Sequence, residues 1–222
     1  MKIINIIREI IHRITGNKTV IDEDMLKSLD FPEKLKLLVE YAGNADPGYR
    51  IFGSETHKYK FNPPVDIEDV RKFEKKYNIK LPESYVTFLT LVGNGGAGPF
   101  YGLYSLEQLE HKNEYLMQDN SIDTFIDKNL TVEKWNKVVK MLYESDNEVE
   151  DFWRRITKGA LVIGTQGCTF DTLLMCSGSE LGKIVYIDWN IFCDNPPLLT
   201  GQTFEEWLIS YFYKVARGDI RK

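Results

Sequence analysis

Residues 81–98, LPESYVTFLTLVGNGGAG, constrain the fold more than any other part of this chain. Pro82 suits the first turn of a helix, where its missing N–H is not needed. Apolar residues follow at helical spacing and predict one buried face, made by Tyr85, Phe88, Leu89 and Val92. The glycines and asparagine at residues 93–96 should end the helix, because both residue types accept the left-handed backbone conformation. The sequence therefore predicts a short buried helix that stops abruptly against other elements.

Two further helices carry clear start and stop signals. Asp66 can cap the first, which should end at residues 78–80. Its expected buried face is Ile67, Val70, Phe73 and Tyr77. Thr203 and Glu206 have capping-box spacing at the start of the second, and Gly218 follows its end. Its expected buried stripe is Trp207, Leu208, Tyr211, Phe212 and Val215. Residues 31–41 are a third helical candidate.

Three short β-rich runs follow one another at residues 160–167, 170–176 and 182–189. Turn residues separate them, which predicts an antiparallel meander. Helical patterns precede and follow these strands along the chain. A chain of 222 residues suits one domain with an extension. Asn62-Pro63-Pro64 marks a boundary between an N-terminal helical extension, residues 1–60, and the main domain, residues 61–217.

The N-terminal segment is amphipathic. Isoleucines recur at helical spacing in residues 3–14, and charged residues such as Arg8 and Arg13 interrupt them. These interruptions break the apolar core that a signal peptide needs, and no run in the chain is long enough to span a bilayer. We expect a cytoplasmic protein whose N-terminal helix docks on its own core. Docking on a membrane surface or on a partner is the alternative.

Acidic charge is concentrated in one segment. Residues 119–151 hold nine acids and four lysines, and the difference of −5 equals the net charge of the whole chain. The acids are Asp119, Asp123, Asp127, Glu133, Glu144, Asp146, Glu148, Glu150 and Asp151. A chain without a basic stripe is not expected to bind nucleic acid directly. The acidic segment instead favours a basic partner.

Aromatic residues supply candidate anchors for a partner, because binding energy concentrates in tryptophan, tyrosine and arginine. Tyr101 and Tyr104 flank the glycine-rich run, and Trp135 and Trp153 flank the acidic segment. The alternative is that these four side chains close the core. The candidate partner-binding residues are Tyr101, Tyr104, Asp119, Asp123, Asp127, Glu144, Asp146, Glu148, Glu150, Asp151 and Trp153.

No set of residues suggests catalysis, a metal or a cofactor. The three histidines lack metal-ligand spacing, and the three cysteines contain no CxxC pair, which favours reduced thiols. The glycine-rich run lacks GK[ST] and follows a helix, so it is not a phosphate loop. We therefore expect no enzyme. A nucleophilic Cys168 assisted by a histidine is the weaker alternative.

Residues 81–110 resemble the central signature of the SUKH superfamily, which includes the Smi/Knr-type fungal cell-wall regulators and many bacterial toxin-immunity proteins. The signature is Leu-Pro, a tyrosine, an aromatic-leucine pair, Asn-Gly-Gly and a following Gly-Leu strand. Here these are Leu81-Pro82, Tyr85, Phe88-Leu89, Asn94-Gly95-Gly96 and Gly102-Leu103. The later strands and the final helix match the same order. The resemblance covers roughly residues 62–216, and residues 1–60 and 111–157 depart from the minimal pattern.

The resemblance implies an α+β fold: a single SUKH-like domain, with a mostly antiparallel sheet packed with helices, that binds proteins. In bacteria such domains commonly neutralise a cognate nuclease or other toxin inside the producing cell, and a basic nuclease would suit the acidic segment. We therefore expect a cytoplasmic immunity protein that acts on a polymorphic or contact-dependent toxin without any cofactor. A non-enzymatic scaffold or regulator like the fungal members is the alternative.

Overall fold

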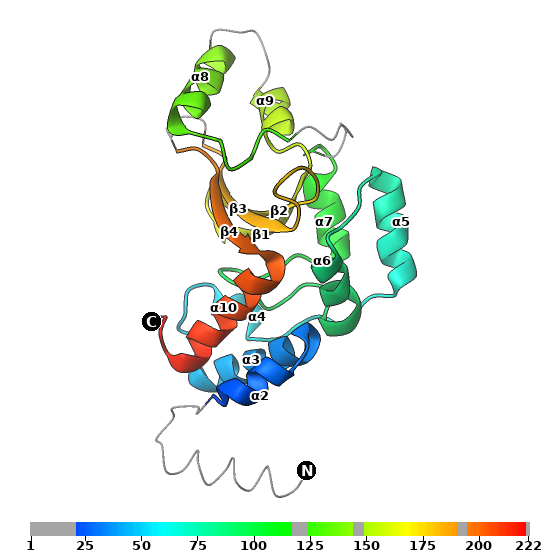
Figure 1. Cartoon of the computed structure of the whole chain (residues 1–222), viewed down its shortest axis with the longest axis vertical. Helices are drawn as coiled ribbons and strands as arrows, with labels where there is room; N and C mark the ends of the chain where they lie inside the picture. Colours follow the sequence, from blue (N-terminus) through cyan, green and yellow to red (C-terminus); the bar gives the residue numbers. More distant parts are fainter. Residues whose placement is uncertain (1–20, 117–123, 144–148, 191–194, 221–222) are drawn as a thin grey trace, which may run out of the picture.

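The structure is a computed structural model that describes residues 21–116, 124–143, 149–190 and 195–220. Its centre is a four-stranded antiparallel sheet with the strands in sequence order (Figure 1). The strands are β1 (Ala160–Gly167), β2 (Phe170–Met175), β3 (Lys183–Asp188) and β4 (Leu198–Thr203). The predicted α+β class and the predicted meander are confirmed. The sequence did not predict β4, because its Thr-Gly-Gln stretch follows two prolines and has little apolar alternation.

Helices precede and follow the sheet. Before the sheet lie α2 (Glu23–Ser28), α3 (Phe31–Ala45), α4 (Ser54–His57), α5 (Ile67–Tyr77), α6 (Glu83–Thr87) with the π-helical turn η1 (Phe88–Val92), α7 (Leu106–Asn113), α8 (Val132–Tyr143) and α9 (Val149–Ile156). The chain closes with α10 (Phe204–Arg217), which continues directly from β4.

Both faces of the sheet are buried. Successive side chains of a strand point to opposite faces, so each strand contributes to two clusters. Leu161 and Ile163 pack in a cluster with α3, α5, α7 and α10. Val162, Leu173 and Val185 pack in a second cluster with α8 and α9. The molecule therefore has three layers, and Figure 1 shows α8 and α9 above the sheet and α3 and α10 below it.

Helix α3 belongs to the main core. Leu35 and Leu38 are fully buried, and Phe31 meets Phe204 of α10 edge-on at a ring distance of 6.4 Å. The side chain of Asp30 caps the start of the helix by accepting the N–H of Glu33 at 3.0 Å. The predicted helix at 31–41 is thus confirmed and runs four residues further, to Ala45. The isoleucine-rich segment lies outside the described residues.

Most predicted helix ends are where the sequence placed them. Asp66 caps α5, and Asn78 ends it with a φ of 47°. Thr203 and Glu206 form the capping box of α10. The predicted face of α5 needs one correction, because Ile67 is 40% exposed and the buried residues of this helix are Val70, Phe73 and Tyr77. Position 67 opens the helix, before its first turn meets the core. The face at Tyr85, Phe88, Leu89 and Val92 is buried as predicted.

The glycine-rich run does more than end a helix. Gly96 forms antiparallel bridges with Phe61 on one side and Leu103 on the other. The next residue, Tyr104, donates its N–H to the carbonyl of Ile163 in β1 at 2.9 Å. We call this arrangement the glycine crossing: residues 60–62, 95–97 and 102–104, which carry backbone hydrogen bonding outward from the edge of β1. The prediction that this run ends the helix is confirmed, but Gly93, which ends it, has an extended φ of 178°, and the left-handed φ values come later, at Gly95 and Gly96.

Close backbone contact explains why two glycines are needed in the glycine crossing. A Cβ on Gly96 would lie 2.5 Å from the carbonyl oxygen of Lys60, and one on Gly102 would lie 2.2 Å from that of Gly96. Both glycines have left-handed φ values, 99° and 90°. Asn113 completes the closure of β1, because its buried amide accepts the N–H of Val162 and donates to the carbonyl of the same residue. The edge of β1 is therefore sealed.

A buried carboxylate organises the chain between α3 and α4. Asp46 is fully buried and accepts hydrogen bonds from the N–H groups of Arg50 and Ile51 and the hydroxyls of Ser54 and Tyr59, at 2.9–3.1 Å. Burial by itself raises the pKa of this carboxyl, but the four hydrogen bonds outweigh it and hold the pKa below its usual value. The ionised carboxylate thus fixes the loop that leads to α4.

His57 is buried beside this loop. Its Nδ1 accepts the N–H of Tyr59 at 3.1 Å, so the ring is a neutral acceptor at that atom. Burial lowers its pKa from 6.5 to about 4, although the carbonyls of Gly98 and Phe100 act in the opposite direction. His57 therefore joins the Asp46 loop to the residues that follow the glycine-rich run.

The glycine crossing predicts a strong effect of one added methyl group. Gly102→Ala should lower the free energy of unfolding by about 4 kcal/mol, since strain from a left-handed φ adds to overpacking. Gly201→Ala is the matched control, because Gly201 also has a left-handed φ, 77°, but nothing lies within 4 Å of its added Cβ. It should cost only about 1 kcal/mol. Urea unfolding of both variants measures the difference, and equal costs would contradict the close contact.

His57 predicts a loss of stability in mild acid. Its folded pKa of about 4 lies below the ordinary 6.5, so between these values the unfolded chain binds a proton that the folded chain does not. The full stability contributed by the neutral ring is present above pH 6.5, and about 3 kcal/mol is lost as the pH falls to 4. His57→Asn keeps an acceptor for Tyr59 and does not titrate. Urea midpoints measured from pH 4 to 7 should be flatter in this variant, and an unchanged slope would refute the assignment.

Candidate partner-binding surface

Tyr101 lies where the sequence analysis expected an anchor, on the loop after the glycine-rich run. Its ring is half-buried and meets the ring of Phe52 at 5.3 Å in an edge-on geometry. Its N–H donates to the carbonyl of Thr165, which ties the loop to the end of β1. Phe52 is 62% exposed, so the pair presents an aromatic edge to solvent. The sequence analysis did not single out Phe52, because it stands alone in a turn-rich segment.

Tyr104 connects the two hydrophobic clusters on either side of the sheet. Its half-buried ring packs against both hydrophobic clusters, and Lys112 lies over the ring with its Nζ 5.8 Å from the centroid. Burial raises the pKa of its hydroxyl. A partner could therefore reach only part of this side chain.

The two tryptophans named as possible anchors are core residues. Trp135 is 1% exposed and Trp153 is 7% exposed. Trp153 packs between Trp135, at 6.1 Å, and Trp189, at 5.1 Å, in the cluster beneath α8 and α9. The expectation that Trp153 is an exposed anchor is wrong, because α9 turns its apolar face onto the sheet and takes this side chain with it. The alternative, that the tryptophans close the core, is what the structure shows.

The structure describes fewer than half of the predicted acidic contact residues. Asp127, Glu150 and Asp151 are described, and Asp119, Asp123, Glu144, Asp146 and Glu148 lie outside the described residues. Glu150 is exposed at the start of α9, and Asp127 accepts the N–H of Asn129 in the loop before α8. Asp151 pairs with Arg154 one turn along α9. The acids that make the segment acidic thus cluster in the sequence at residues 144–151, where α8 ends and α9 begins.

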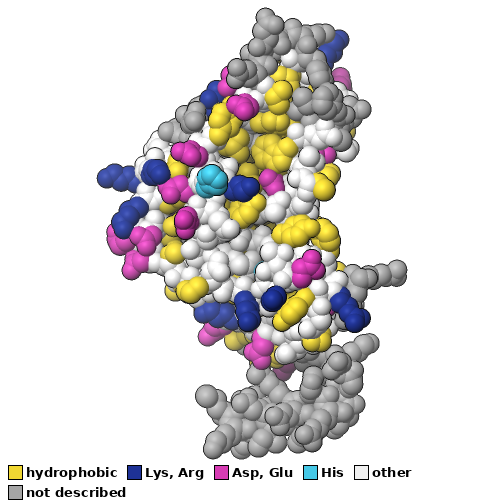
Figure 2. Space-filling view, turned by 180° about the vertical axis from the view of Figure 1, so that it is seen from behind, with side chains coloured by type: hydrophobic (Ala, Val, Ile, Leu, Met, Phe, Trp, Pro, Cys, Tyr) yellow, Lys and Arg dark blue, Asp and Glu magenta, His cyan; other side chains and the backbone are white. Residues whose placement is uncertain are grey.

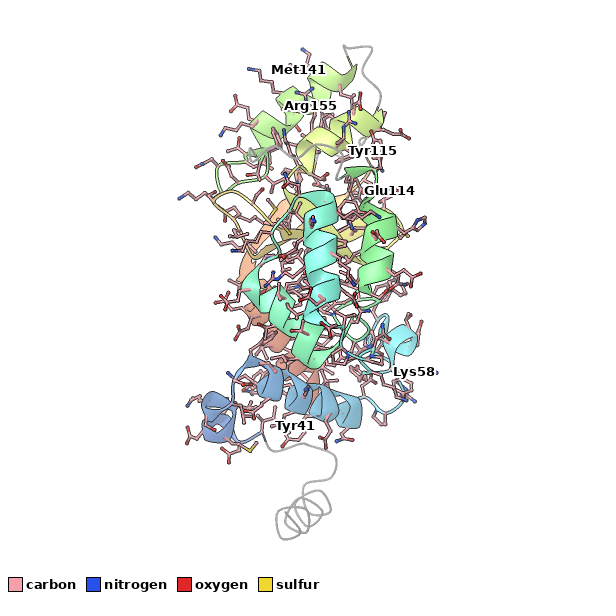
Figure 3. The ribbon with its side chains drawn as sticks, turned by 90° about the vertical axis from the view of Figure 1, so that its right-hand side faces the viewer. Tyr41, Lys58, Glu114, Tyr115, Met141 and Arg155 are labelled. Atoms are coloured by element: carbon pink, nitrogen blue, oxygen red, sulfur yellow. The ribbon has the colours of Figure 1, made fainter. Side chains whose placement is uncertain are left out.

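Helices α8 and α9 form a distinct end of the molecule. An apolar groove of about 350 Å³ runs between them, lined by Phe125, Val138, Met141, Leu142, Phe152 and Ile156 with the charged side chains of Asp151, Arg154 and Arg155. Met141 is 58% exposed at its rim. Figure 3 shows Met141 and Arg155 at this end, with Tyr115 below them. In Figure 2 hydrophobic side chains gather toward the same end.

A second hollow lies on the other side of the sheet, and we call it the aromatic pocket. It has a volume of about 360 Å³. Its lining comes from four parts of the chain: the loop at residues 51–52, the loop at 99–100, strand β3, and the continuous run from β4 through α10 to Ile220. The residues are Ile51, Phe52, Pro99, Phe100, Tyr186, Gln202, Trp207, Ser210, Tyr211, Lys214 and Ile220. Sequence reasoning placed Trp207 and Tyr211 in a buried stripe and missed the pocket, because no local pattern joins these four segments.

No catalytic arrangement is visible in the described residues. Cys168 is exposed in the turn between β1 and β2, with a φ of 52°, and Cys176 is buried with its thiol pKa raised by burial. The described residues contain no group of three or more histidine, cysteine, aspartate or glutamate side chains that could hold a metal ion. Within those same residues, every helix is too short or too polar to cross a membrane.

Comparison with known proteins agrees with this architecture. The sequence model of the SMI1 / KNR4 family (SUKH-1) matches residues 64–210, which begin just before α5 and end within α10. No curated protein matches the chain. The matched region contains residues 95–97 and 102–104 of the glycine crossing, all four strands and the first half of the final helix, and it is well over half of the chain. The chain therefore belongs to the SMI1 / KNR4 (SUKH-1) family.

Proposed function

We propose that this protein is an immunity protein that binds and neutralises a cognate polymorphic or contact-dependent toxin, a basic nuclease, in the cytoplasm of the cell that makes the toxin. Membership of the SUKH-1 family supports a role in binding proteins. The acidic segment supports a basic partner, since an inhibitor of opposite charge speeds the encounter and covers the phosphate-binding surface of a nuclease.

The observation that carries the proposal is the position of the acids in the sequence. Residues 144–151 hold Glu144, Asp146, Glu148, Glu150 and Asp151, five acids in eight positions. In the sequence they span the junction of α8 and α9, and the two acids that the structure describes, Glu150 and Asp151, lie in the first turn of α9. The basic residues of α9, Arg154 and Arg155, come after the acids, in the last turn of the helix. The junction therefore combines a net negative charge with the exposed Met141 near the end of α8.

Co-purification tests the function directly. The tagged full chain should retain the toxin domain encoded by the adjacent upstream gene, and its co-expression should restore growth to cells that make that domain. A toxin domain that neither binds nor loses its toxicity would refute the proposal. Retention without rescue of growth would refute neutralisation. The alternative, a non-enzymatic scaffold or regulator like the fungal members, predicts instead that no toxin gene lies next door.

Neutralising the junction should slow association. The fourfold variant with Glu144→Gln, Asp146→Asn, Glu148→Gln and Glu150→Gln should lower the association rate about tenfold at low salt, and the difference should vanish at high salt because mobile ions screen the steering field. Stopped-flow or surface-plasmon measurements against the same toxin domain give the rates.

A variant of equal charge provides the control for the acidic junction. Four exposed acids elsewhere on the molecule are available for replacement by glutamine: Glu40, Glu55, Glu83 and Glu107. This control has the same net charge but leaves the junction intact, so its association rate should stay close to that of the wild-type chain. Equal slowing in both variants would attribute the effect to net charge and count against a binding face at α8 and α9.

A further inference from the structure

The aromatic pocket is a built site that toxin binding at α8 and α9 does not use. It lies on the α10 side of the sheet, whereas α8 and α9 cover the other face. Phe52 is 62% exposed and lies in the lining of the pocket. The rings of Phe100 and Tyr186, which also line the pocket, meet edge-on at 5.7 Å. Concave pockets with aromatic walls and a few polar groups are the usual form of a binding site.

Strained backbone surrounds this pocket. Among the described residues, six that are not glycine have left-handed φ values, and four of them lie in the two segments that carry its wall loops. These four are Tyr49, Lys58, Tyr59 and Phe100, with φ values of 50–56°. Each such residue costs about 1–2 kcal/mol and persists only where its surroundings hold it. The strained residues are thus concentrated where the loops at 51–52 and 99–100 meet. This concentration indicates that the arrangement of the two loops has a function.

The polar groups of the pocket limit what can bind there. The indole N–H of Trp207 donates to the hydroxyl of Tyr186 at 2.7 Å, so these two groups satisfy each other. The hydroxyl of Tyr211 is itself buried, so it is not open to a ligand in the pocket. Gln202 and Ser210 are the other polar side chains of the lining, and Lys214 is its charged residue. The pocket thus offers aromatic walls, two uncharged polar side chains and a positive rim.

We propose that the aromatic pocket binds an aromatic side chain that a partner protein presents on an acidic segment. Rings pack edge-on against the aromatic walls, and a flanking carboxylate pairs with Lys214. Because the occupant is acidic, this site selects a partner segment of opposite charge from the one that the acidic junction selects. One chain can therefore bind two partner segments of opposite charge at the same time, each on its own surface.

A peptide titration tests the site without any toxin. The probe is the capped peptide Gly-Asp-Trp-Asp-Gly, added to the ¹⁵N-labelled full chain and followed by amide chemical shifts. Saturable shifts should appear at Phe52, Phe100 and Gln202, with a Kd on the order of 1 mM for so small a ligand. Replacing the peptide tryptophan by alanine should abolish these shifts, and replacing both aspartates by lysine should raise the Kd about fivefold.

Two matched pairs of variants assign the contacts. Phe52→Ala should abolish binding, whereas Leu91→Ala, which removes a side chain that is 56% exposed outside the pocket, should leave it unchanged. Lys214→Glu should weaken binding about fivefold, whereas Lys36→Glu on the exposed side of α3 should not. Well-dispersed spectra of the variants show that each one is folded.

Three results would overturn the proposal: no saturable shift at the pocket, equal binding of the lysine-flanked peptide, or the same loss in both members of a pair. If sedimentation gives a mass of twice that of the chain, and Phe52→Ala reduces it to that of a single chain, the pocket would instead be assigned to binding a second copy. Toxin co-purification is scored separately, so a failure of either proposal leaves the other standing.

Discussion

The close approach of backbone at Gly96 and Gly102 is the constraint on which the rest of the structure depends. At these two positions residues 60–62, 95–97 and 102–104 come so near to one another that a single Cβ would collide with a carbonyl oxygen. The contact joins the helices that precede the crossing to β1 through the hydrogen bond from Tyr104 to Ile163. It also brings Gly102 close to His57, whose Cδ2 would lie 3.3 Å from a Cβ added at Gly102. The loop that supplies Pro99 and Phe100 to the aromatic pocket is therefore positioned by this contact.

A sheet that is buried on both faces requires a helical layer on each side. Here α3 and α10 supply one layer, and the segment that contains α8 and α9 supplies the other. This explains why Trp135 lies within the acidic segment and why Phe152 and Trp153 follow it directly. These three side chains pack in the same cluster as Leu173 and Val185 of the sheet.

Local patterns predicted the elements well. The caps at Asp66 and Thr203, the stop at Asn78 and the buried face at Tyr85 and Phe88 are all present, because each depends on hydrogen bonds or side-chain spacing within a few residues. The exposed anchors were predicted less well. Trp153 is buried and Phe52 is exposed, and a residue's type carries no information about which neighbours the fold brings to it.

The sequence by itself determined the antiparallel meander and the boundaries of α5 and α10, since these depend on local periodicity, caps and turn residues. One ordered motif indicated the family and, with it, the α+β class. Only the tertiary structure decided that the glycine-rich run is a backbone crossing, that α8 and α9 form a third layer, and that residues from four separate segments line an aromatic pocket. The physical reason is that these features are contacts between residues far apart in the chain. Whether a glycine is needed at position 102 depends on the carbonyl of Gly96, whose position no local pattern reveals.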